Sequence, residues 1–346
     1  MIPHSRPMVG EEEAQAMAAV LASGNLAQGR EVEAFEKETA AFLGRRYGIA
    51  VNSGTAALHL ALMALGVHPE DSVAVPSYAC ASLTQAIAWQ RAHPVLCEID
   101  KDFNLDPAKV PAEVRAVVVP HLFGATAALP QHNCVVEDLA QAFGGTAGKE
   151  GIVAITSFYA TKLLTTGEGG MVFTDDEGIA AFVRDRRDYD NRDDFQIRYA
   201  YKMTEFQAAM GRVQLKRLPD FLARRQEIGA RYHEGLRHLP LVLPRQEDHL
   251  YFRFVLSTPE GPQLIPWLRE HGVGASRPVH RPAHHTLGGR FDRSEEAHQF
   301  NVSIPIYPAM TRQEVEYVVE CVVQYYNEML DSAAKHAMPA GGVPLG

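Results

Sequence analysis

Short apolar runs alternate with helical stretches along most of the chain. From Glu11 to Leu43 the apolar positions recur at helical spacing, with interruptions at Gly24 and Gly29. Runs rich in valine and isoleucine, bounded by turn residues, then predict strands: YGIAV, SVAVPS, HPVLCEI, AVVVP, NCVVE, VAITSF and GMVFT. Helical segments such as TAALHLALMALG separate several of them. Because these strands have no polar face, they predict an α/β fold whose mostly parallel sheet is covered on both sides.

A second pattern begins after a charged segment, DRRDYDNRDD, at residues 185–194, which we expect to be a solvated loop. From about Thr204 to His238 apolar residues return at helical spacing, and we expect this stripe to serve core or dimer packing. Beyond Pro240 two strand-like runs, YFRFVLS and VSIPIYP, mix with helical segments. We therefore predict a large domain over residues 1–238, a smaller C-terminal α/β domain over 239–330 and a disordered tail over 331–346.

Composition narrows the class of protein. The chain has 346 residues, with 33 lysines and arginines against 42 aspartates and glutamates, so its formal net charge is −9. Nucleic acids and anionic membranes attract basic surfaces, and this balance argues against either as a partner. No apolar run approaches the roughly 18–20 residues needed to span a bilayer, and the acidic N-terminal segment lacks the apolar core of a signal peptide. We therefore expect a cytoplasmic protein.

Cysteines and histidines show no metal-binding or disulfide pattern. The four cysteines are irregularly spaced and form no CxxC pair, so we expect buried free thiols. The segment SRPVHRPAHH is rich in histidine, but Pro278 and Pro282 interrupt any helix and the spacing matches no metal motif. We therefore expect no metal site. Candidate donors to a diphosphate are Arg6, Arg30, Arg277, His280 and Arg281, although a surface role is the simpler interpretation of each.

The first chemical motif is the junction in AVNSGTAALHLAL, where a strand leads through Ser53, Gly54 and Thr55 into a helix. A helix N-terminus presents unpaired N–H groups and a partial positive charge. Glycine lets the backbone come close to a ligand, and threonine adds a hydroxyl group. A phosphate group would fit there. Taken alone, however, a serine before a helix is more often only an N-cap.

Two further motifs place a carboxylate and an amine near strand ends. In NCVVEDLAQAFGG an apolar strand ends at Glu137 and Asp138, where a carboxylate can hold a protonated ring nitrogen or merely cap a helix. In ITSFYATKLLTTGEGG, Lys162 lies among apolar and small residues, five positions after Ser157. Most lysines are solvated surface charges, but a desolvated lysine beside phosphate-binding groups can act as a nucleophile. A phosphate site, a ring-nitrogen carboxylate and an imine-forming lysine together indicate pyridoxal 5'-phosphate (PLP).

These motifs, in this order and at these separations, resemble the DegT/DnrJ/EryC1/StrS family of PLP-dependent sugar aminotransferases. Other stretches agree, among them SGNLAQGREVEAFEKETAAFLG, PSYACASLTQAI, YKMTEFQAAMGRVQLKRL and SIPIYP, so that the likeness covers roughly residues 3–330. The resemblance implies the aspartate-aminotransferase fold (fold type I) and active sites completed across a homodimer interface. It also implies transfer of an amino group, with glutamate as the expected donor, to a keto sugar linked to a nucleotide.

The resemblance assigns roles by position in this chain. Lys162 corresponds to the residue that forms the internal aldimine with PLP and later moves the proton. Asp138 corresponds to the partner of the pyridine nitrogen, and Gln141 to an amide close to the cofactor ring. The phosphate ligands of the family correspond to Gly54, Thr55 and Ser157.

The chain departs from the family pattern at two cofactor-binding positions. Cys80 stands where an aromatic residue often stacks on the pyridine ring, with Tyr78 two residues earlier. Ala200 stands where many members carry an asparagine that reaches the partner's cofactor phosphate. That contact is either lost or replaced, with Lys202 and Arg198 as the candidate substitutes.

Two alternatives stay open at this point. One is an aminotransferase for a cyclitol or another non-nucleotide ketone. The other is a PLP-binding regulatory protein that has lost turnover. The presence of Lys162 favours amino transfer, because a dehydrating branch of the family replaces this lysine by histidine.

Overall fold

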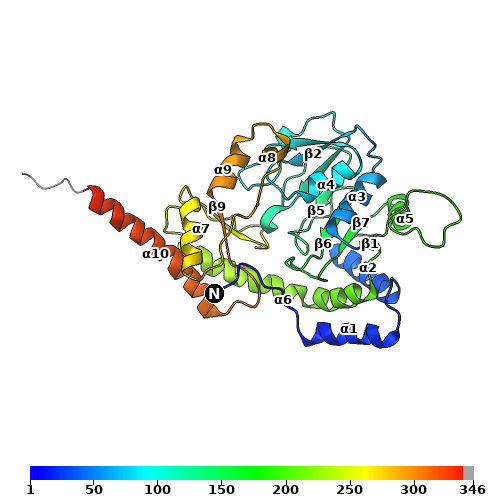
Figure 1. Ribbon diagram of the computed structural model, residues 1–346, viewed down its shortest axis with the longest axis horizontal. Coiled ribbons are helices and arrows are strands. Elements are labelled where there is room, and N and C mark those ends of the chain that lie inside the picture. Colours follow the sequence, from blue (N-terminus) through cyan, green and yellow to red (C-terminus); the bar gives the residue numbers. More distant parts are fainter. Residues whose placement is uncertain (338–346) are drawn as a thin grey trace, which may run out of the picture.

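The apolar runs between Tyr47 and Thr174 form a seven-stranded sheet in the computed structural model, which describes residues 1–337 (Figure 1). The strands are β1 (Tyr47–Val51), β2 (Ser72–Pro76), β3 (His93–Cys97), β4 (Ala116–Pro120), β5 (Val135–Asp138), β6 (Val153–Ser157) and β7 (Gly170–Thr174). Their order across the sheet is β1-β7-β6-β5-β4-β2-β3. Only β7 runs antiparallel to its neighbours, β1 and β6. The prediction of a mostly parallel sheet is confirmed.

Helices cover both faces of this sheet because successive strand residues point to opposite sides. In β1, for example, Ile49 and Val51 join the core under α3, α4 and α5, whereas Ala50 joins the core under α2 and the first half of α6. The helices are α2 (Arg30–Leu43), α3 (Gly54–Ala64), α4 (Ser82–Trp89), α5 (Glu177–Arg186) and α6 (Glu205–Leu236). Short 3-10 helices, η1 (Pro107–Lys109) and η2 (Leu122–Gly124), lie in the loops after β3 and β4.

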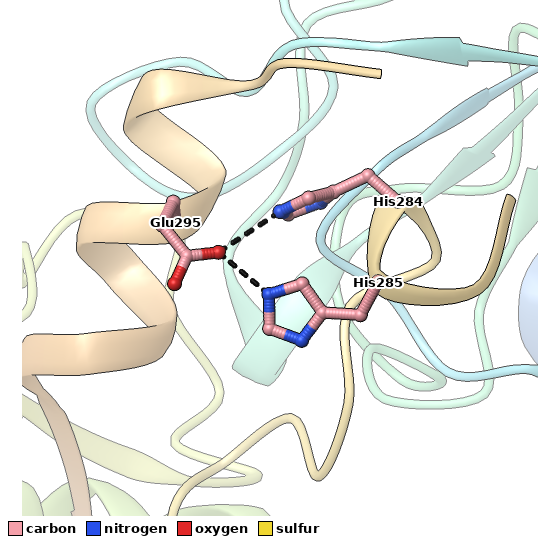
Figure 2. A group of neighbouring side chains, drawn as sticks. All are labelled: His284, His285 and Glu295. Carbon is pink, nitrogen blue, oxygen red and sulfur yellow. Dashed lines mark hydrogen bonds and ion pairs between the residues drawn. The ribbon is translucent and has the colours of Figure 1, made fainter. Parts of the chain in front are cut away.

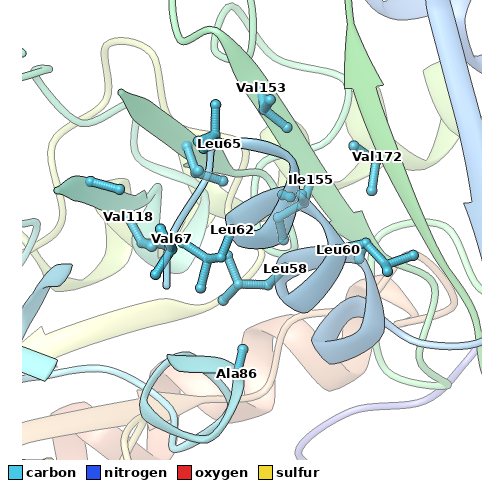
Figure 3. Close-up of a cluster of buried hydrophobic side chains, with 14 of the residues drawn as sticks. Leu58, Leu60, Leu62, Leu65, Val67, Ala86, Val118, Val153, Ile155 and Val172 are labelled. Atoms are coloured by element: carbon cyan, nitrogen blue, oxygen red, sulfur yellow. The ribbon is translucent and has the colours of Figure 1, made fainter. Parts of the chain in front are cut away.

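Helix α3 lies at the centre of the first core. Its sequence, GTAALHLALMA, is apolar almost all round, as expected for a helix buried on most sides. Figure 3 shows Leu58 and Leu62 among Val118 and Ile155 of the sheet, in one cluster of buried side chains. This packing fixes where the N-terminus of α3 meets the sheet.

The N-terminal helices agree with the sequence pattern. Helix α1 (Glu11–Ser23) ends at Gly24, whose φ of 74° is left-handed, and Gly29 is the N-cap of α2. In Figure 1, α1 lies along the long helix α6. The carboxylate of Glu205, at the start of α6, accepts hydrogen bonds from the backbone N–H groups of Gly29 and Val32 at 2.8 and 2.9 Å. A side chain of α6 therefore satisfies the open end of α2.

A smaller α/β unit follows α6. Strands β8 (Phe254–Ser257) and β9 (Asn301–Ile304) pair antiparallel, with α7 (Gly261–Glu270), α8 (His284–Leu287), α9 (Asp292–Phe300) and α10 (Arg312–Ala337) around them. Its core also contains Ile228, Tyr232 and Leu236 of α6, and Ile2 from the other end of the chain. The backbone N–H of Ile2 donates to the Gly272 carbonyl at 2.8 Å. The end of α6 and the first residues of the chain thus pack with this unit, not with the sheet.

Two expectations need correction. Helix α10 continues past Asp331 to Ala337, so helix occupies part of the predicted tail; residues 338–346 lie outside the described residues. In the predicted apolar stripe of α6, Phe221, Ile228 and Tyr232 are buried but Phe206 is half-buried. The first half of the helix instead contributes Ala208, Leu215 and Leu218 to the core under α2. Within residues 1–337, no helix combines the length and apolarity needed to cross a bilayer.

Candidate active site

A cavity of about 280 Å³ opens where the parallel strands reach their carboxyl ends. Loops after neighbouring parallel strands meet at one edge of a sheet, and ligands of open α/β sheets bind there. All seven residues that the sequence singles out line this cavity: Gly54, Thr55, Cys80, Asp138, Gln141, Ser157 and Lys162. A larger cavity of about 740 Å³ lies around the α1–α2 connection. It contains none of these residues, and its Glu205 carboxylate already accepts backbone N–H groups.

Close backbone approach shapes one end of the cavity. A Cβ atom on Gly54 would lie 2.7 Å from the Ser157 Cβ, and one on Gly170 would lie 2.3 Å from the Ser53 carbonyl oxygen. Glycine at both positions therefore lets the start of α3 approach β6 and β7. The Ser53 hydroxyl accepts the Ala56 N–H at 3.1 Å and caps the helix. The first N–H groups of a helix have no partner within it, so this corner suits an anion.

The loop that carries Lys162 is closed on itself by backbone hydrogen bonds. The N–H of Phe158 donates to the Gly169 carbonyl at 2.8 Å, and the N–H of Thr166 donates to the Phe158 carbonyl at 2.9 Å. Gly169 has a φ of 156°, and a Cβ there would lie 2.5 Å from the Thr166 Oγ1. This compact turn presents the Lys162 side chain to the cavity.

The Lys162 amine lies among groups that change its proton affinity. Burial lowers the pKa of Lys162. The interactions with Cys80 and Asp138 raise this pKa, and the Arg253 guanidinium lowers it further, so that the net direction is down. The ammonium nitrogen also lies 5.2 Å from the centre of the Phe252 ring. A lowered pKa increases the fraction of neutral amine, the form that can attack a carbonyl carbon.

Asp138 supplies the buried carboxylate of the cavity, at the last position of β5. It accepts the Ala140 N–H at 2.8 Å. Burial raises the pKa of Asp138. This bond and the charges of Lys162 and His121 act in the opposite direction, but the net direction is up. A cation in the cavity would favour the ionised carboxylate.

The neighbouring Glu137 has a structural role. Consecutive strand residues point to opposite faces, and Glu137 accepts the N–H groups of Gly148 and Gly151, each at 2.7 Å. The His121 Nε2–H donates to it at 3.1 Å, because His121 Nδ1 accepts the Ala127 N–H. Burial raises the pKa of Glu137, but these bonds outweigh it and bring the pKa to about 2. Of the two adjacent acids, only Asp138 lines the cavity.

Comparison with known proteins agrees with this site. A family model described as the DegT/DnrJ/EryC1/StrS aminotransferase family matches residues 7–323. The chain belongs to this family. The spore coat polysaccharide biosynthesis protein SpsC of Bacillus subtilis is 35% identical, over 93% of this chain and 96% of that protein. GDP-perosamine synthase of Caulobacter vibrioides is 32% identical, over 86% and 90%.

The fold of the family is confirmed by solved structures. DesV of S. venezuelae, in complex with a ketimine intermediate, superposes with a TM-score of 0.86 at 31% identity, over 91% of this chain and 94% of that one. The chain is therefore an aminotransferase with the predicted fold type I architecture.

At the first departure, Cys80 reaches the cavity and Tyr78 does not. Tyr78 is fully buried, and its hydroxyl donates to the Ala297 carbonyl at 3.3 Å. The Cys80 thiol is exposed and forms a hydrogen bond of 2.8 Å with the Ser82 hydroxyl. The expectation of buried thiols is thus wrong for Cys80 and correct for Cys97 and Cys321, and all four cysteines are free.

At the second departure, both expected substitutes for the family asparagine are held within their own loop. The Lys202 ammonium forms ion pairs with Asp188, at 2.9 Å, and with Asp190. Arg198 forms two more with acidic residues of the same segment, at 3.0 and 2.8 Å. These pairs also give the charged loop after α5 its internal contacts.

Gln141 and the candidate arginines complete the comparison with the sequence. The Gln141 Oε1 accepts the Phe123 N–H at 2.7 Å, which orients the amide at the cavity wall. Arg6 lines a small cavity that Lys162 shares, whereas Arg30 lines the cavity between α1 and α2. Of these two, only Arg6 shares a cavity with a residue of the candidate site.

Sequence reasoning missed two residues of the C-terminal unit, Phe252 and Arg253. Both lie in YFRFVLS, and a charged residue inside an apolar run is a signal that could have identified the arginine. Burial lowers the pKa of Arg253 to about 10, and its Nη1 donates to the His4 Nδ1 at 2.8 Å. The guanidinium lies 5.0 Å from the Phe252 ring that also contacts Lys162.

Proposed function

We propose that the chain is a PLP-dependent aminotransferase that moves an amino group from glutamate to a keto sugar linked to a nucleotide. The observation that carries the proposal is the meeting of Lys162, Asp138 and the N-terminus of α3 in one cavity. Each group matches a different part of PLP: an aldehyde, a basic ring nitrogen and a phosphate.

The residues of the cavity fit PLP chemically. The close approach of Gly54 to Ser157 leaves a helix N-terminus and hydroxyl groups facing the cavity, where Gly54, Thr55 and Ser157 would hold the phosphate. Asp138 would hold the ring nitrogen in its protonated form, because a nearby carboxylate favours the cation. Lys162 would form the covalent bond to the aldehyde carbon, since its lowered pKa favours the neutral amine.

When bound, PLP supplies an electron sink for the carbanion that forms as the donor loses its Cα proton. The chain must move that proton, and the Lys162 amine, which lines the same cavity, would act as the base. Asp138 would keep the ring nitrogen protonated. The Gln141 amide is held at the wall of the cavity by its hydrogen bond from the Phe123 N–H.

Relatives support the substrate class. The GDP-perosamine synthase of Caulobacter vibrioides and the polysaccharide biosynthesis protein SpsC align with most of this chain. Arg6, which shares a small cavity with Lys162, is the candidate donor to a substrate phosphate. Nothing in the described residues favours a cyclitol instead. The intact set of Lys162, Asp138 and Gly54 argues against a protein that has lost turnover.

We also propose a homodimer. The loop after α5 exposes two large apolar side chains, Phe195 at 97% and Ile197 at 67%, which water alone would surround in a single chain. Active sites of the resembled family are completed across such an interface.

Covalent trapping tests the proposal. Reduction of the PLP-loaded protein with borohydride should add the mass of the reduced cofactor to the peptide that contains Lys162. Lys162→Ala should abolish this label and lower turnover at least about 1,000-fold. Lys149→Ala, which removes an exposed lysine, should retain both. Turnover is measured with glutamate and keto sugars linked to GDP or TDP, and with inosose-type ketones. A label that survives in Lys162→Ala, or activity with inososes alone, contradicts the proposal.

A further inference from the structure

We propose that His284, His285 and Glu295 form a zinc site in the C-terminal unit. Figure 2 shows both imidazole rings turned toward one carboxylate oxygen, with the histidines on α8 and the glutamate on α9. The Glu295 Oε2 lies 3.0 Å from the His284 Nε2 and 2.6 Å from the His285 Nε2. The three ligand atoms all lie within 4.8 Å of one another. None of these residues lines the cavity of Lys162.

The donor set selects the metal. Two imidazole nitrogens and one carboxylate oxygen are typical ligands of zinc, whereas magnesium and calcium prefer oxygen alone. Ligand atoms about 2.1 Å from a tetrahedral zinc ion lie roughly 3.4 Å apart, so the cluster needs only a small opening to admit one. Three protein ligands leave the fourth position to water. Glu295 is about half exposed (52% of its side chain), so an ion can reach the cluster.

The surroundings of His284 support a ligand role. Its Nδ1 is hydrogen-bonded to the hydroxyl of Ser77, which follows β2 and is fully buried. Zinc-binding histidines usually donate their second nitrogen to such a partner, which fixes the ring and directs the other nitrogen to the metal. The Ser77 carbonyl also accepts the Ala283 N–H at 2.8 Å, so the start of α8 is anchored to the sheet.

His285 and Glu295 are also held toward the common point. The His298 ring, one turn beyond Glu295 on α9, packs edge-on against His285 with 5.0 Å between ring centres. A bound ion would join α8 to α9 and, through Ser77, to the end of β2.

The spacing of cysteines and histidines along the chain does not reveal this cluster. The third ligand comes from the next helix, after a turn in which Gly288 and Gly289 have φ values of 84° and 98°. Neighbouring histidines at positions 284 and 285 cannot share a helix face, so no helical metal motif contains them. Their convergence depends on this turn.

Zinc binding to the tag-free full chain tests the site. After dialysis against a chelator, the wild-type protein should bind one zinc ion per chain. The affinity for zinc should be at least tenfold lower in His285→Ala and in Glu295→Gln. Ser77→Ala should weaken binding about tenfold, as loss of a supporting hydrogen bond does at other zinc sites. The matched controls are His93→Ala and Glu70→Gln, because His93 and Glu70 form an exposed pair at 2.8 Å with no third ligand among residues 1–337.

Two further measurements separate zinc binding from misfolding and from cofactor chemistry. Zinc should raise the Tm of the wild type and of His93→Ala by about 3–5 °C, and leave that of Glu295→Gln unchanged. Lys162→Ala should bind zinc like the wild type, so failure of the proposed function would leave this result intact. The site is excluded if the wild type binds no more zinc than Glu295→Gln, or if His93→Ala loses as much as His285→Ala.

Discussion

The cavity around Lys162 and the cluster of His284, His285 and Glu295 are assembled in different ways. Each of the seven predicted cavity residues lies at the end of a strand of one sheet, as Asp138 does, in the loop that follows, or at the start of the next helix, as Gly54 does. The cluster joins two helices of the C-terminal unit across a glycine turn.

The difference shows why the residues of one site can be predicted from the sequence and those of the other cannot. Parallel strands bring their carboxyl ends to one edge, so the position of a residue after a strand already predicts where it lies. No comparable rule relates α8 to α9. If the two regions are independent, substitutions in the cavity should change chemistry without changing zinc affinity.

The largest effect should come from Asp138→Asn. Asparagine keeps the shape and can still accept the Ala140 N–H, but it removes the charge that would stabilise a protonated ring nitrogen. We expect kcat to fall about 1,000-fold, with zinc affinity and Tm close to those of the wild type. Steady-state kinetics and equilibrium dialysis give the two values.

Glu150→Gln is the matched control, because the Glu150 side chain is exposed and lies outside the cavity. If Asp138→Asn retains more than a tenth of the wild-type kcat, the carboxylate does not have the proposed role. A loss of zinc affinity equal to that of Glu295→Gln would show that the two regions are coupled.

Much of the fold could be predicted because buried strands leave a plain signal. Every predicted valine-rich run between Tyr47 and Thr174 forms a strand, and the breaks at Gly24 and Gly29 separate two helices. The antiparallel pairing of β7 could not be predicted, because a buried apolar run such as GMVFT can pair with its neighbours in either direction.

Packing partners were harder to predict than elements. An amphipathic pattern shows that Ile228 and Tyr232 face a core, but not which core, and both join the C-terminal unit. The same limit applies at the site. Arg253 and Phe252 come from a distant part of the chain and reach Lys162 through tertiary packing alone.

A moderate effect is expected from Gly54→Ala, which tests the phosphate end of the cavity. The added methyl group would lie 2.7 Å from the Ser157 Cβ, so the start of α3 must move away from β6. We expect the affinity for PLP to fall roughly tenfold, as measured by fluorescence titration of the cofactor-free protein.

A second substitution should identify the clash as the cause. In the double variant Gly54→Ala with Ser157→Gly the obstructing Cβ is gone. Adding Gly54→Ala to Ser157→Gly should therefore lower the affinity for PLP by less than adding it to the wild type. Gly10→Ala is the control, because a Cβ there meets only the Glu13 Oε2 at 4.0 Å. If Gly54→Ala lowers the affinity for PLP equally in the wild type and in Ser157→Gly, the clash with the Ser157 Cβ is not the cause.

The smallest effect concerns the Cys80 thiol, which lines the cavity. Cys80 raises the pKa of Lys162, so Cys80→Ala should lower that pKa further from the ordinary value of 10.5. Because the neutral amine is the reactive form, PLP capture should speed up as pH rises through the Lys162 pKa. In Cys80→Ala this rise should move to lower pH, which makes capture roughly two- to threefold faster at neutral pH. Stopped-flow absorbance from pH 6 to 10 measures the profile, with Cys134→Ala as the control outside the cavity. A profile that moves to higher pH would mean that the thiol does not act on Lys162 through charge.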